Sequence, residues 1–317
     1  MAGFITKIVG LSAYTGLVAV TLPYLQQLDF TSPSLLRDVV PFFQPSPQPS
    51  TSPKEETPIT QEPVEEPFTC LPQNYTTQIV SLDPLVIYIH DFLNERDIAG
   101  LLSAGEPAFR PSFVTKNGRT QGSPDRTSSS AGLPLDAPAV QCVLARAEKF
   151  MGTMLAPGRD EIGPPQLVRY TAGQRFNLHH DWYDDFQPDM TLHRRRRWNR
   201  VASFFAILED ECTRGETYFP KIEAVTPQEL AGERLWRRHE EGGLAFKPVR
   251  GNAVFWVNLH ANGTGDERVV HAGLPLGEGL KTAMNIWPKR YIGPEAWGVV
   301  EEEEEELVVD DAEVGPV

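Results

Sequence analysis

Residues 169–181 read RYTAGQRFNLHHD, and the interpretation of the whole chain begins with this stretch. His179 and Asp181 stand two residues apart in it. On a β-strand, residues i and i+2 point to the same side, so both side chains can reach one metal ion, while His180 points away. A lone His-x-Asp is a weak signal, because a buried, hydrogen-bonded histidine is the commoner structure. The stretch therefore indicates a metal site only together with a further ligand.

A third candidate ligand lies far along the chain, in the segment RVVHAGLP at residues 268–275. Two imidazoles and one carboxylate, here His179, His271 and Asp181, form the ligand set of non-haem Fe(II) oxygenases and leave positions open for a cosubstrate and O₂. Lys281 follows His271 by ten residues. On the next antiparallel strand it would point into the same cavity, where a buried ammonium needs an anion. A dicarboxylate cosubstrate supplies one.

The periodicity of the body predicts two helices followed by many short strands. Asn94 is a plausible N-cap for a helix that ends near Leu102, and an apolar stripe predicts a second helix over 136–155. Residues 110–134 are rich in Ser, Thr, Gly and Pro and read as a long loop. Strands are expected at 83–90, 166–170, 175–180, 201–208, 244–248, 253–258, 268–272 and 281–287. This order predicts an α+β fold with a sandwich or barrel at its core.

Four ordered motifs over residues 126–287 resemble the prolyl 4-hydroxylases, which are Fe(II)- and 2-oxoglutarate-dependent dioxygenases. The stretch 169–181 resembles their iron motif, and 271–281, with Trp287 beyond, resembles their distal His–Lys module. Residues 215–220 (GETYFP) resemble a Gly-Gly-Glu-Thr-x-Phe-Pro segment, and 248–256 (PVRGNAVFW) resemble a Pro-x-x-Gly-x-Ala-x-x-Phe strand. Arg126 to Ser130 more weakly resembles an Arg-x-Ser loop of the family.

The resemblance implies a double-stranded β-helix (a jelly-roll, cupin-like barrel) with the N-terminal helices packed outside it. It implies Fe(2+) held by His179, Asp181 and His271, and 2-oxoglutarate held by Lys281. O₂ and L-ascorbate complete the expected cofactors, and a proline-containing peptide or protein is the expected partner, converted to 4-hydroxyproline with release of succinate and CO₂. Further assignments are Tyr170 and Thr217 to 2-oxoglutarate, and Phe176, Trp287 and Arg126 to substrate. Ordinary strand packing is the alternative for Tyr170 and Thr217, as core packing is for Trp287.

The sequence also departs from the family pattern. Arg214 replaces the first glycine of the Gly-Gly-Glu-Thr segment, and Phe176 stands where a tyrosine is common. An insert at 189–200 contains four consecutive arginines, Arg194 to Arg197, which read as a solvated loop or as a device that steers an acidic segment. These departures concern the substrate more than the metal. Hydroxylation of another residue or of a small molecule, and a non-catalytic peptide-binding barrel, therefore stay open as alternatives.

Charge and cysteine content narrow the class of protein. The chain has 317 residues and a formal net charge of −14. Residues 301–317 hold nine acidic residues and no basic ones, which leaves −5 for the rest. A mildly acidic body argues against nucleic acid as a partner. Cys70, Cys142 and Cys212 are too few for a disulfide scaffold, so either one disulfide with one free thiol or three thiols is expected.

The chain ends are expected to lie outside the fold. Residues 1–28 read as a signal anchor, with a cleaved signal peptide or a plain apolar helix as alternatives. Residues 29–72 form a Pro-rich linker, 73–293 the dioxygenase domain and 294–317 an acidic disordered tail. Sequons at Asn74 and Asn262, with the leader, predict a single-pass type II membrane protein whose catalytic domain faces the lumen of the endoplasmic reticulum, or else a soluble luminal or secreted chain.

Overall fold

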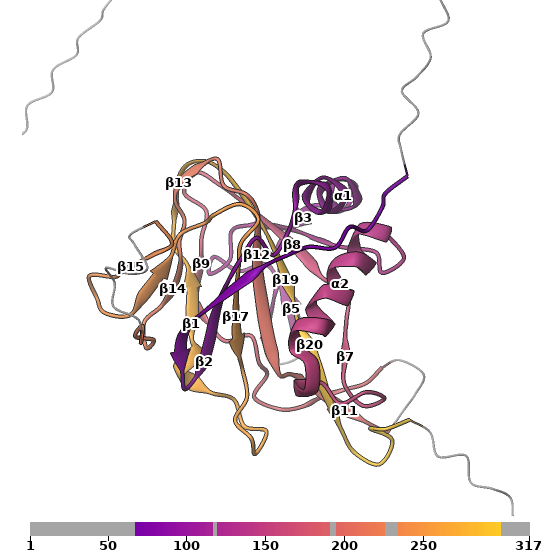
Figure 1. The fold of residues 1–317 in the computed structure, drawn as a ribbon. Coiled ribbons are helices and arrows are strands. Elements are labelled where there is room, and N and C mark those ends of the chain that lie inside the picture. Colours follow the sequence, from indigo (N-terminus) through magenta and orange to yellow (C-terminus); the bar gives the residue numbers. More distant parts are fainter. Residues whose placement is uncertain (1–66, 117–118, 191–194, 226–233, 299–317) are drawn as a thin grey trace, which may run out of the picture. The chain divides into compact units, whose positions relative to one another are not determined.

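A large antiparallel sheet forms the centre of the fold in the computed structural model, which describes residues 67–116, 119–190, 195–225 and 234–298 (Figure 1). Its strand order is β1-β2-β17-β12-β19-β8-β6-β3, and β13 pairs with β19 off this path. The strands are β1 (Thr76–Leu82), β2 (Leu85–His90), β3 (Arg110–Pro111), β6 (Ser129–Gly132), β8 (Gln166–Thr171), β12 (Ala202–Glu209), β13 (Cys212–Arg214), β17 (Ala253–Val257) and β19 (Leu276–Ile286).

A second, five-stranded sheet packs its side chains against the first. Its order is β15-β16-β14-β18-β9. Tyr88 of the large sheet stacks on Phe246 of the small one, with ring centroids 6.2 Å apart, and Trp256 meets Phe219 edge-on at 5.2 Å. Two facing antiparallel sheets with an apolar interior confirm the expected double-stranded β-helix. The strands are β9 (Phe176–His179), β14 (Thr217–Phe219), β15 (Trp236–Arg238), β16 (Leu244–Phe246) and β18 (His271–Gly273).

Two helices cover the outer face of the large sheet, as expected (Figure 1). α1 (Glu95–Gly105) begins at Asn94, whose side chain and that of Asp97 form a capping box. α2 (Pro138–Met151) starts with a proline, whose missing N–H is no loss in the first turn. Strand side chains alternate, so β12 directs Phe204 towards the helices and its neighbour Phe205 into the barrel.

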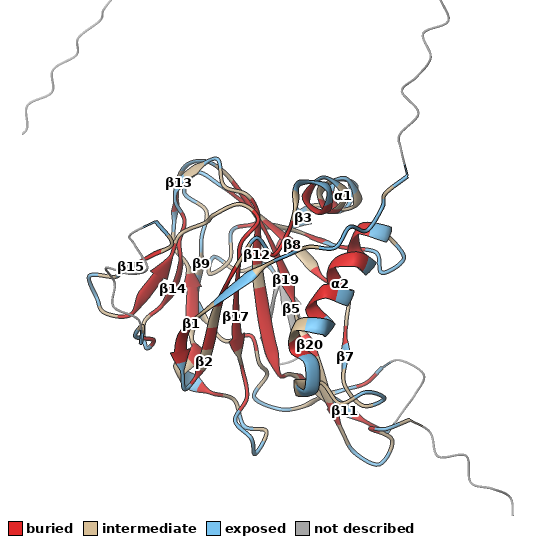
Figure 2. Ribbon diagram, in the orientation of Figure 1, coloured by how far each residue is buried: buried red, intermediate tan, exposed pale blue. Residues whose placement is uncertain are grey.

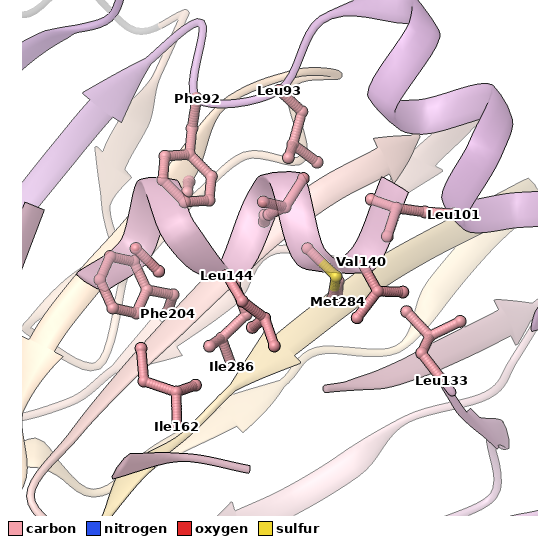
Figure 3. Close-up of a cluster of buried hydrophobic side chains, with 14 of the residues drawn as sticks. Phe92, Leu93, Leu101, Leu133, Val140, Leu144, Ile162, Phe204, Met284 and Ile286 are labelled. Carbon is pink, nitrogen blue, oxygen red and sulfur yellow. The ribbon is translucent and has the colours of Figure 1, made fainter. Parts of the chain in front are cut away.

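The helix-facing side chains form the principal apolar core (Figure 3). Phe204, Met284 and Ile286 are fully buried there against α2. Figure 2 shows the central strands buried along their length, with the exposed helix faces turned outward. Burial on both faces is the reason that β12 reads as a nearly continuous apolar run, with Ser203 as the polar exception before Glu209 ends the strand.

Short elements occupy the stretch that was expected to be one long loop. Residues 110–134 contain β3, β4 (Val114–Lys116), β5 (Arg119–Gln121) and β6, and β6 pairs with β8. The loop prediction was therefore wrong in part, because strand pairing supplied the regularity that local composition does not show. The remaining elements are β7 (Glu161–Ile162), β10 (Gln187–Pro188), β11 (Arg197–Arg200) and β20 (Pro288–Ile292), and the 3-10 helices η1 (Glu106–Ala108), η2 (Gly152–Met154) and η3 (Glu267–Val269).

The arginine run is not simply a solvated loop. Arg196 is buried, forms an ion pair with Asp189 at 2.6 Å, and lies 3.7 Å from the ring centroid of Tyr291. Arg195 pairs with Glu295 at 2.7 Å. A buried guanidinium needs such partners, and they are supplied by segments distant in sequence. Arg194 lies outside the described residues.

One disulfide joins the described N-terminal segment to the helical layer. Cys70 and Cys142 are bonded, and Cys142 belongs to α2. Cys212 is free. Of the two expectations for the cysteines, one disulfide with one free thiol is confirmed.

The expected single-pass membrane localisation is contradicted. None of the helices within the described residues is long and apolar enough to cross a membrane. α1 and α2 have 11 and 14 residues, whereas a span needs ~20. Residues 1–28, on which the anchor was placed, lie outside the described residues, as do most of 29–72 and 294–317, so the domain boundaries stay predictions. Asn74 and Asn262 are exposed, and their glycosylation also stays a prediction.

Candidate metal centre and cosubstrate site

The three expected metal ligands lie together on the five-stranded sheet. His179 ends β9 and His271 begins β18, and the two residues are register partners in that pair of strands. Asp181 follows β9 rather than lying on it, yet its carboxylate remains on the same side. One ligand atom from each of these three residues lies within 4.8 Å of the other two. The arrangement brings two imidazoles and one carboxylate to a single point, as the sequence predicted.

Backbone carbonyls orient both imidazole rings. The Nδ1–H of His179 donates to the carbonyl of Asn177 at 2.8 Å, and that of His271 donates to the carbonyl of Val269 at 3.0 Å. These bonds set the tautomer and leave each Nε2 lone pair available for a metal. Phe176 stacks on the His179 ring with centroids 3.6 Å apart, and Phe219 stacks on His271 at 5.2 Å. Rings fixed in this way are already arranged for binding.

Asp181 is held by side chains of the large sheet. Its Oδ2 accepts hydrogen bonds from Ser203 Oγ at 2.7 Å and from Trp287 Nε1 at 3.0 Å. Ser203 Oγ in turn accepts a hydrogen bond from Asn258 Nδ2 at 2.9 Å. Asp181, Ser203 and Asn258 are all buried. Partners of this kind orient a ligating carboxylate and are part of the site.

Electrostatics favour the neutral form of His179 and the ionised form of Asp181. Burial, together with the neighbouring His271, lowers the pKa of His179 below its ordinary value. Burial alone would raise the pKa of Asp181, but His271, His179 and Arg200 outweigh it and the pKa is lowered. A neutral imidazole and an ionised carboxylate are the forms that coordinate a divalent cation. The donor set therefore fits Fe(II).

A cavity of about 1070 Å³ opens over this cluster. Its wall includes Tyr170, Thr217, Phe205 and Asn285. Tyr170 and Thr217 are buried, and burial raises the pKa of Tyr170, so its hydroxyl stays protonated and can donate a hydrogen bond. Two of the three expected cosubstrate residues, Tyr170 and Thr217, thus line the cavity that the metal cluster borders, whereas Lys281 is not among its lining residues.

Lys281 lies at the back of this wall. It is the register partner of Tyr170, and its Nζ is 4.7 Å from the centroid of the Tyr170 ring. The ammonium donates to the carbonyl of Gly215 at 2.5 Å, and no described carboxylate forms an ion pair with it. Burial lowers the pKa of Lys281 to about 8. A nearly inaccessible ammonium with one neutral acceptor is poised to exchange that acceptor for an anion.

The strand relationship expected between His271 and Lys281 is different in the structure. β18 belongs to the small sheet and β19 to the large one, so they are not paired neighbours. Lys281 reaches the interior because the two sheets face each other. Side chains along β19 alternate between the two faces of the sheet. Met284 and Ile286 face the helices, whereas Lys281 lies on the opposite face together with Asn285 and, beyond the strand, Trp287.

The departure at Arg214 has a visible consequence. Arg214 adopts φ 60° and Gly215 adopts φ 78°. A left-handed backbone favours glycine because a Cβ is crowded there. This preference accounts for the two glycines that the Gly-Gly-Glu-Thr segment of the family has at these two positions. Here Arg214 takes up that conformation, and the next carbonyl still accepts from Lys281.

The expected substrate residues lie in the cavity wall. Phe176, Trp287 and Arg126 all line the cavity, and the Arg126 guanidinium lies 4.9 Å from the Phe176 ring centroid. Trp287 also has the role described above, because its indole N–H donates to Asp181. Their contact with substrate stays a prediction.

Sequence reasoning missed several residues of this site: Arg200, Ser203, Asn258 and Asn285. Ser203 had a signal, because it is the one polar side chain within the buried run ASFFAIL at 202–208. Asn258 follows the apolar strand β17 and carried a similar signal. Arg200 and Asn285 had none, since a lone arginine or asparagine near a strand is commonplace.

The part of the chain that holds this site is similar to known proteins. Residues 165–289 match the model of the 2OG-Fe(II) oxygenase superfamily. The chain is 29% identical over 222 residues to prolyl 4-hydroxylase 1 of Arabidopsis thaliana, covering 68% of this chain and 73% of that protein. It is 28% identical over 215 residues to human prolyl 4-hydroxylase subunit alpha-3, covering 68% of this chain and 35% of that one.

Among solved structures, the viral collagen prolyl hydroxylase of Paramecium bursaria Chlorella virus-1 is similar, with a TM-score of 0.45 and 18% identity, over 65% of this chain and 96% of that one.

Proposed function

From the premise that the chain is a prolyl 4-hydroxylase-like 2OG-Fe(II) oxygenase, and so a 2-oxoglutarate- and Fe(II)-dependent dioxygenase, we propose that it converts a proline of a peptide or protein to 4-hydroxyproline. The observation that carries the proposal is the convergence of His179, Asp181 and His271 at a cavity that also exposes Tyr170 and Thr217. The names of the relatives support proline as the residue that is oxidised.

Each part of the site has a distinct task in this proposal. Bound Fe(II) and 2-oxoglutarate supply the oxidising power for inserting one oxygen atom of O₂ into a C–H bond, with succinate and CO₂ as coproducts. The Nε2 atoms of His179 and His271 and the carboxylate of Asp181 hold the metal and leave the remaining positions open. Lys281 binds the distal carboxylate of 2-oxoglutarate, with Tyr170 and Thr217 as hydroxyl donors.

The walls of the cavity contribute by excluding water and placing the substrate. Phe176, Phe219 and Trp256 surround the two imidazoles with apolar surface. A dry site strengthens the charge-assisted bond of Lys281 and protects the reacting centre from side reactions. Ascorbate, which the family resemblance implies, is proposed only as a reductant that sustains turnover.

The test is a coupled measurement on the purified chain with Fe(II), ascorbate and a panel of proline-bearing peptides. Mass spectrometry should detect a gain of one oxygen atom on proline, in step with formation of succinate. Oxidation of another residue or of a small molecule would replace the proline assignment. Peptide binding without any conversion of 2-oxoglutarate would favour a non-catalytic barrel. A His271→Ala variant provides the matched control, because it removes one proposed ligand.

A further inference from the structure

Asn285 is a buried side chain of the cavity wall to which the proposed function gives no task. It is 8% exposed and lines the cavity, yet its amide forms no hydrogen bond with any other described residue. Gln166, the other amide that the large sheet contributes to the wall, accepts a hydrogen bond from Arg126 at 3.1 Å. A buried amide without a partner costs free energy, and a ligand with a complementary polar group removes that cost.

Strand register places Asn285 in the middle of the large-sheet side of the cavity. It is the register partner of Phe205 on β12 and of Gln166 on β8. Residues directly opposite in an antiparallel pair have Cβ atoms about 4.5–5.5 Å apart. Phe205 and Gln166 line the cavity as Asn285 does, so these three side chains form one row across the sheet.

Lys281 lies to one side of this row. It precedes Asn285 on β19, and side chains at positions i and i+4 of a strand share a face. Its Nζ is 5.8 Å from the centroid of the Phe205 ring, so the ammonium lies near the row that contains Asn285. In the proposed function this ammonium binds the distal carboxylate of 2-oxoglutarate.

The metal ligands lie to the other side of the row. Trp287, at position i+2 from Asn285, donates its indole N–H to Oδ2 of Asp181 at 3.0 Å. Ser203, at position i−2 from Phe205, donates to the same oxygen at 2.7 Å. Along β19, Asn285 therefore lies between the ammonium of Lys281 and the residue that orients Asp181.

The chemistry of an amide suits this place. In the proposed function the 2-oxo acid end of 2-oxoglutarate reaches the metal, and the carboxylate of that end keeps lone pairs that a metal bond does not use. A side-chain N–H of Asn285 can satisfy one of them, as a hydrogen bond to a charged acceptor. An amide is neutral, so it adds no positive charge that would repel a cation held by the nearby ligands.

We propose that Asn285 binds the 2-oxo acid end of 2-oxoglutarate and donates its side-chain N–H to the carboxylate next to the oxo group. The inference rests on the proposed function for the places of the metal and of Lys281, and it does not depend on which substrate residue is oxidised. Lys281 then recognises the distal charge of the cosubstrate, and Asn285 recognises the end that reaches the metal.

Two ligands separate these contacts. They are 2-oxoglutarate and 2-oxopentanoate, which has the same chain length and the same 2-oxo acid end but lacks the distal carboxylate. Binding to the Fe(II)-loaded protein is measured without O₂, by calorimetry and by the visible absorption of a metal-bound 2-oxo acid. Asn285→Ala should weaken both ligands by a similar factor of about 10- to 100-fold, because one hydrogen bond to a charged group is lost. Lys281→Met should weaken 2-oxoglutarate and leave 2-oxopentanoate nearly unchanged.

Two further variants isolate the hydrogen bond. Asn285→Thr keeps a short side-chain donor in a residue that suits a strand, so it should retain more affinity than Asn285→Ala. Asn262→Ala is the matched control, because Asn262 is exposed, lies outside the cavity wall and accepts hydrogen bonds from Thr264. This control should bind both ligands as the unmodified chain does. Iron content and circular dichroism verify that each variant keeps its metal and its fold.

Several results would overturn the inference. Unchanged affinity for both ligands in Asn285→Ala removes the contact. A loss confined to 2-oxoglutarate would assign Asn285 to the distal carboxylate, and a loss of iron with unchanged ligand affinity would assign it to the support of the metal ligands. If the unmodified chain binds neither ligand, the proposed function fails as well. By contrast, the expected Asn285 effect together with oxidation of a residue other than proline would leave this inference standing and refute proline hydroxylation.

Discussion

The indole N–H of Trp287 donates a hydrogen bond to Oδ2 of Asp181 at 3.0 Å, across 106 residues of sequence. Trp287 follows β19 of the large sheet, and Asp181 follows β9 of the small one. Ser203 donates to the same oxygen at 2.7 Å. The carboxylate that completes the proposed metal site on the small sheet is thus oriented by the large sheet.

Removing the hydrogen bonds that Ser203 and Trp287 donate to Asp181 should lower the affinity of the site for iron without unfolding the protein. In Ser203→Ala and Trp287→Phe, Asp181 loses one fixed hydrogen bond, and iron affinity or turnover should fall roughly 10- to 100-fold, as is typical for partners of metal ligands. Iron titration and the rate of succinate formation measure the two effects. Phe205→Leu, which changes the cavity wall but no hydrogen bond to Asp181, should leave iron affinity intact. Unchanged iron affinity in both donor variants would contradict the positioning role.

The two histidines should be indispensable. His179→Ala or His271→Ala removes one of three proposed ligands, so bound iron and turnover should both fall below detection while the chain stays folded. Metal content by atomic spectrometry and thermal unfolding are the readouts. His260→Ala, which changes a histidine outside the cavity, is the control and should retain iron. Near-normal activity in either ligand variant would exclude that residue as a ligand.

Binding of 2-oxoglutarate should depend on the charge of Lys281. Its pKa is lowered to about 8 by burial, so the free protein loses this ammonium as the pH rises through 8, well below the range of an exposed lysine. The dissociation constant of 2-oxoglutarate should therefore increase between pH 7 and pH 9.5. Calorimetry without O₂ gives the profile.

Lys281→Met should abolish this pH dependence and weaken 2-oxoglutarate binding by tens to about a thousandfold, because a buried charged partner is lost. Binding of a neutral peptide should change far less. A flat profile in the unmodified chain would place the anion site elsewhere.

The disulfide should contribute to stability rather than to catalysis. Cys70 and Cys142 close a long loop, and loss of such a cross-link typically costs about 2–4 kcal/mol. Cys142→Ser should lower the melting temperature and leave the 2-oxoglutarate dissociation constant unchanged. Cys212→Ser, at the free thiol, is the control and should melt close to the unmodified chain. Equal melting temperatures for both variants would mean that the cross-link adds nothing to folding stability.

Local chemistry made part of this protein readable from its sequence. His179 and Asp181 stand two residues apart, and this spacing predicted that both side chains could reach one metal ion. The capping box at Asn94 and the apolar stripes of α1 and α2 are likewise properties of short segments. The motif order added His271 and Lys281, and with them the class of chemistry.

Only the tertiary structure determined how these segments meet. Lys281 lies beside Tyr170 on the sheet opposite His271. Ser203, on that same sheet, and Trp287, which follows its strand β19, orient Asp181. Within 110–134, β6 joins the large sheet because it pairs with β8, a strand distant in sequence. Arg196 is buried because Asp189 forms an ion pair with it and the Tyr291 ring packs against it. Sequence periodicity specifies which way a side chain points along its own strand. It carries no information on which strand lies opposite, because that depends on long-range pairing and on the packing of two sheets.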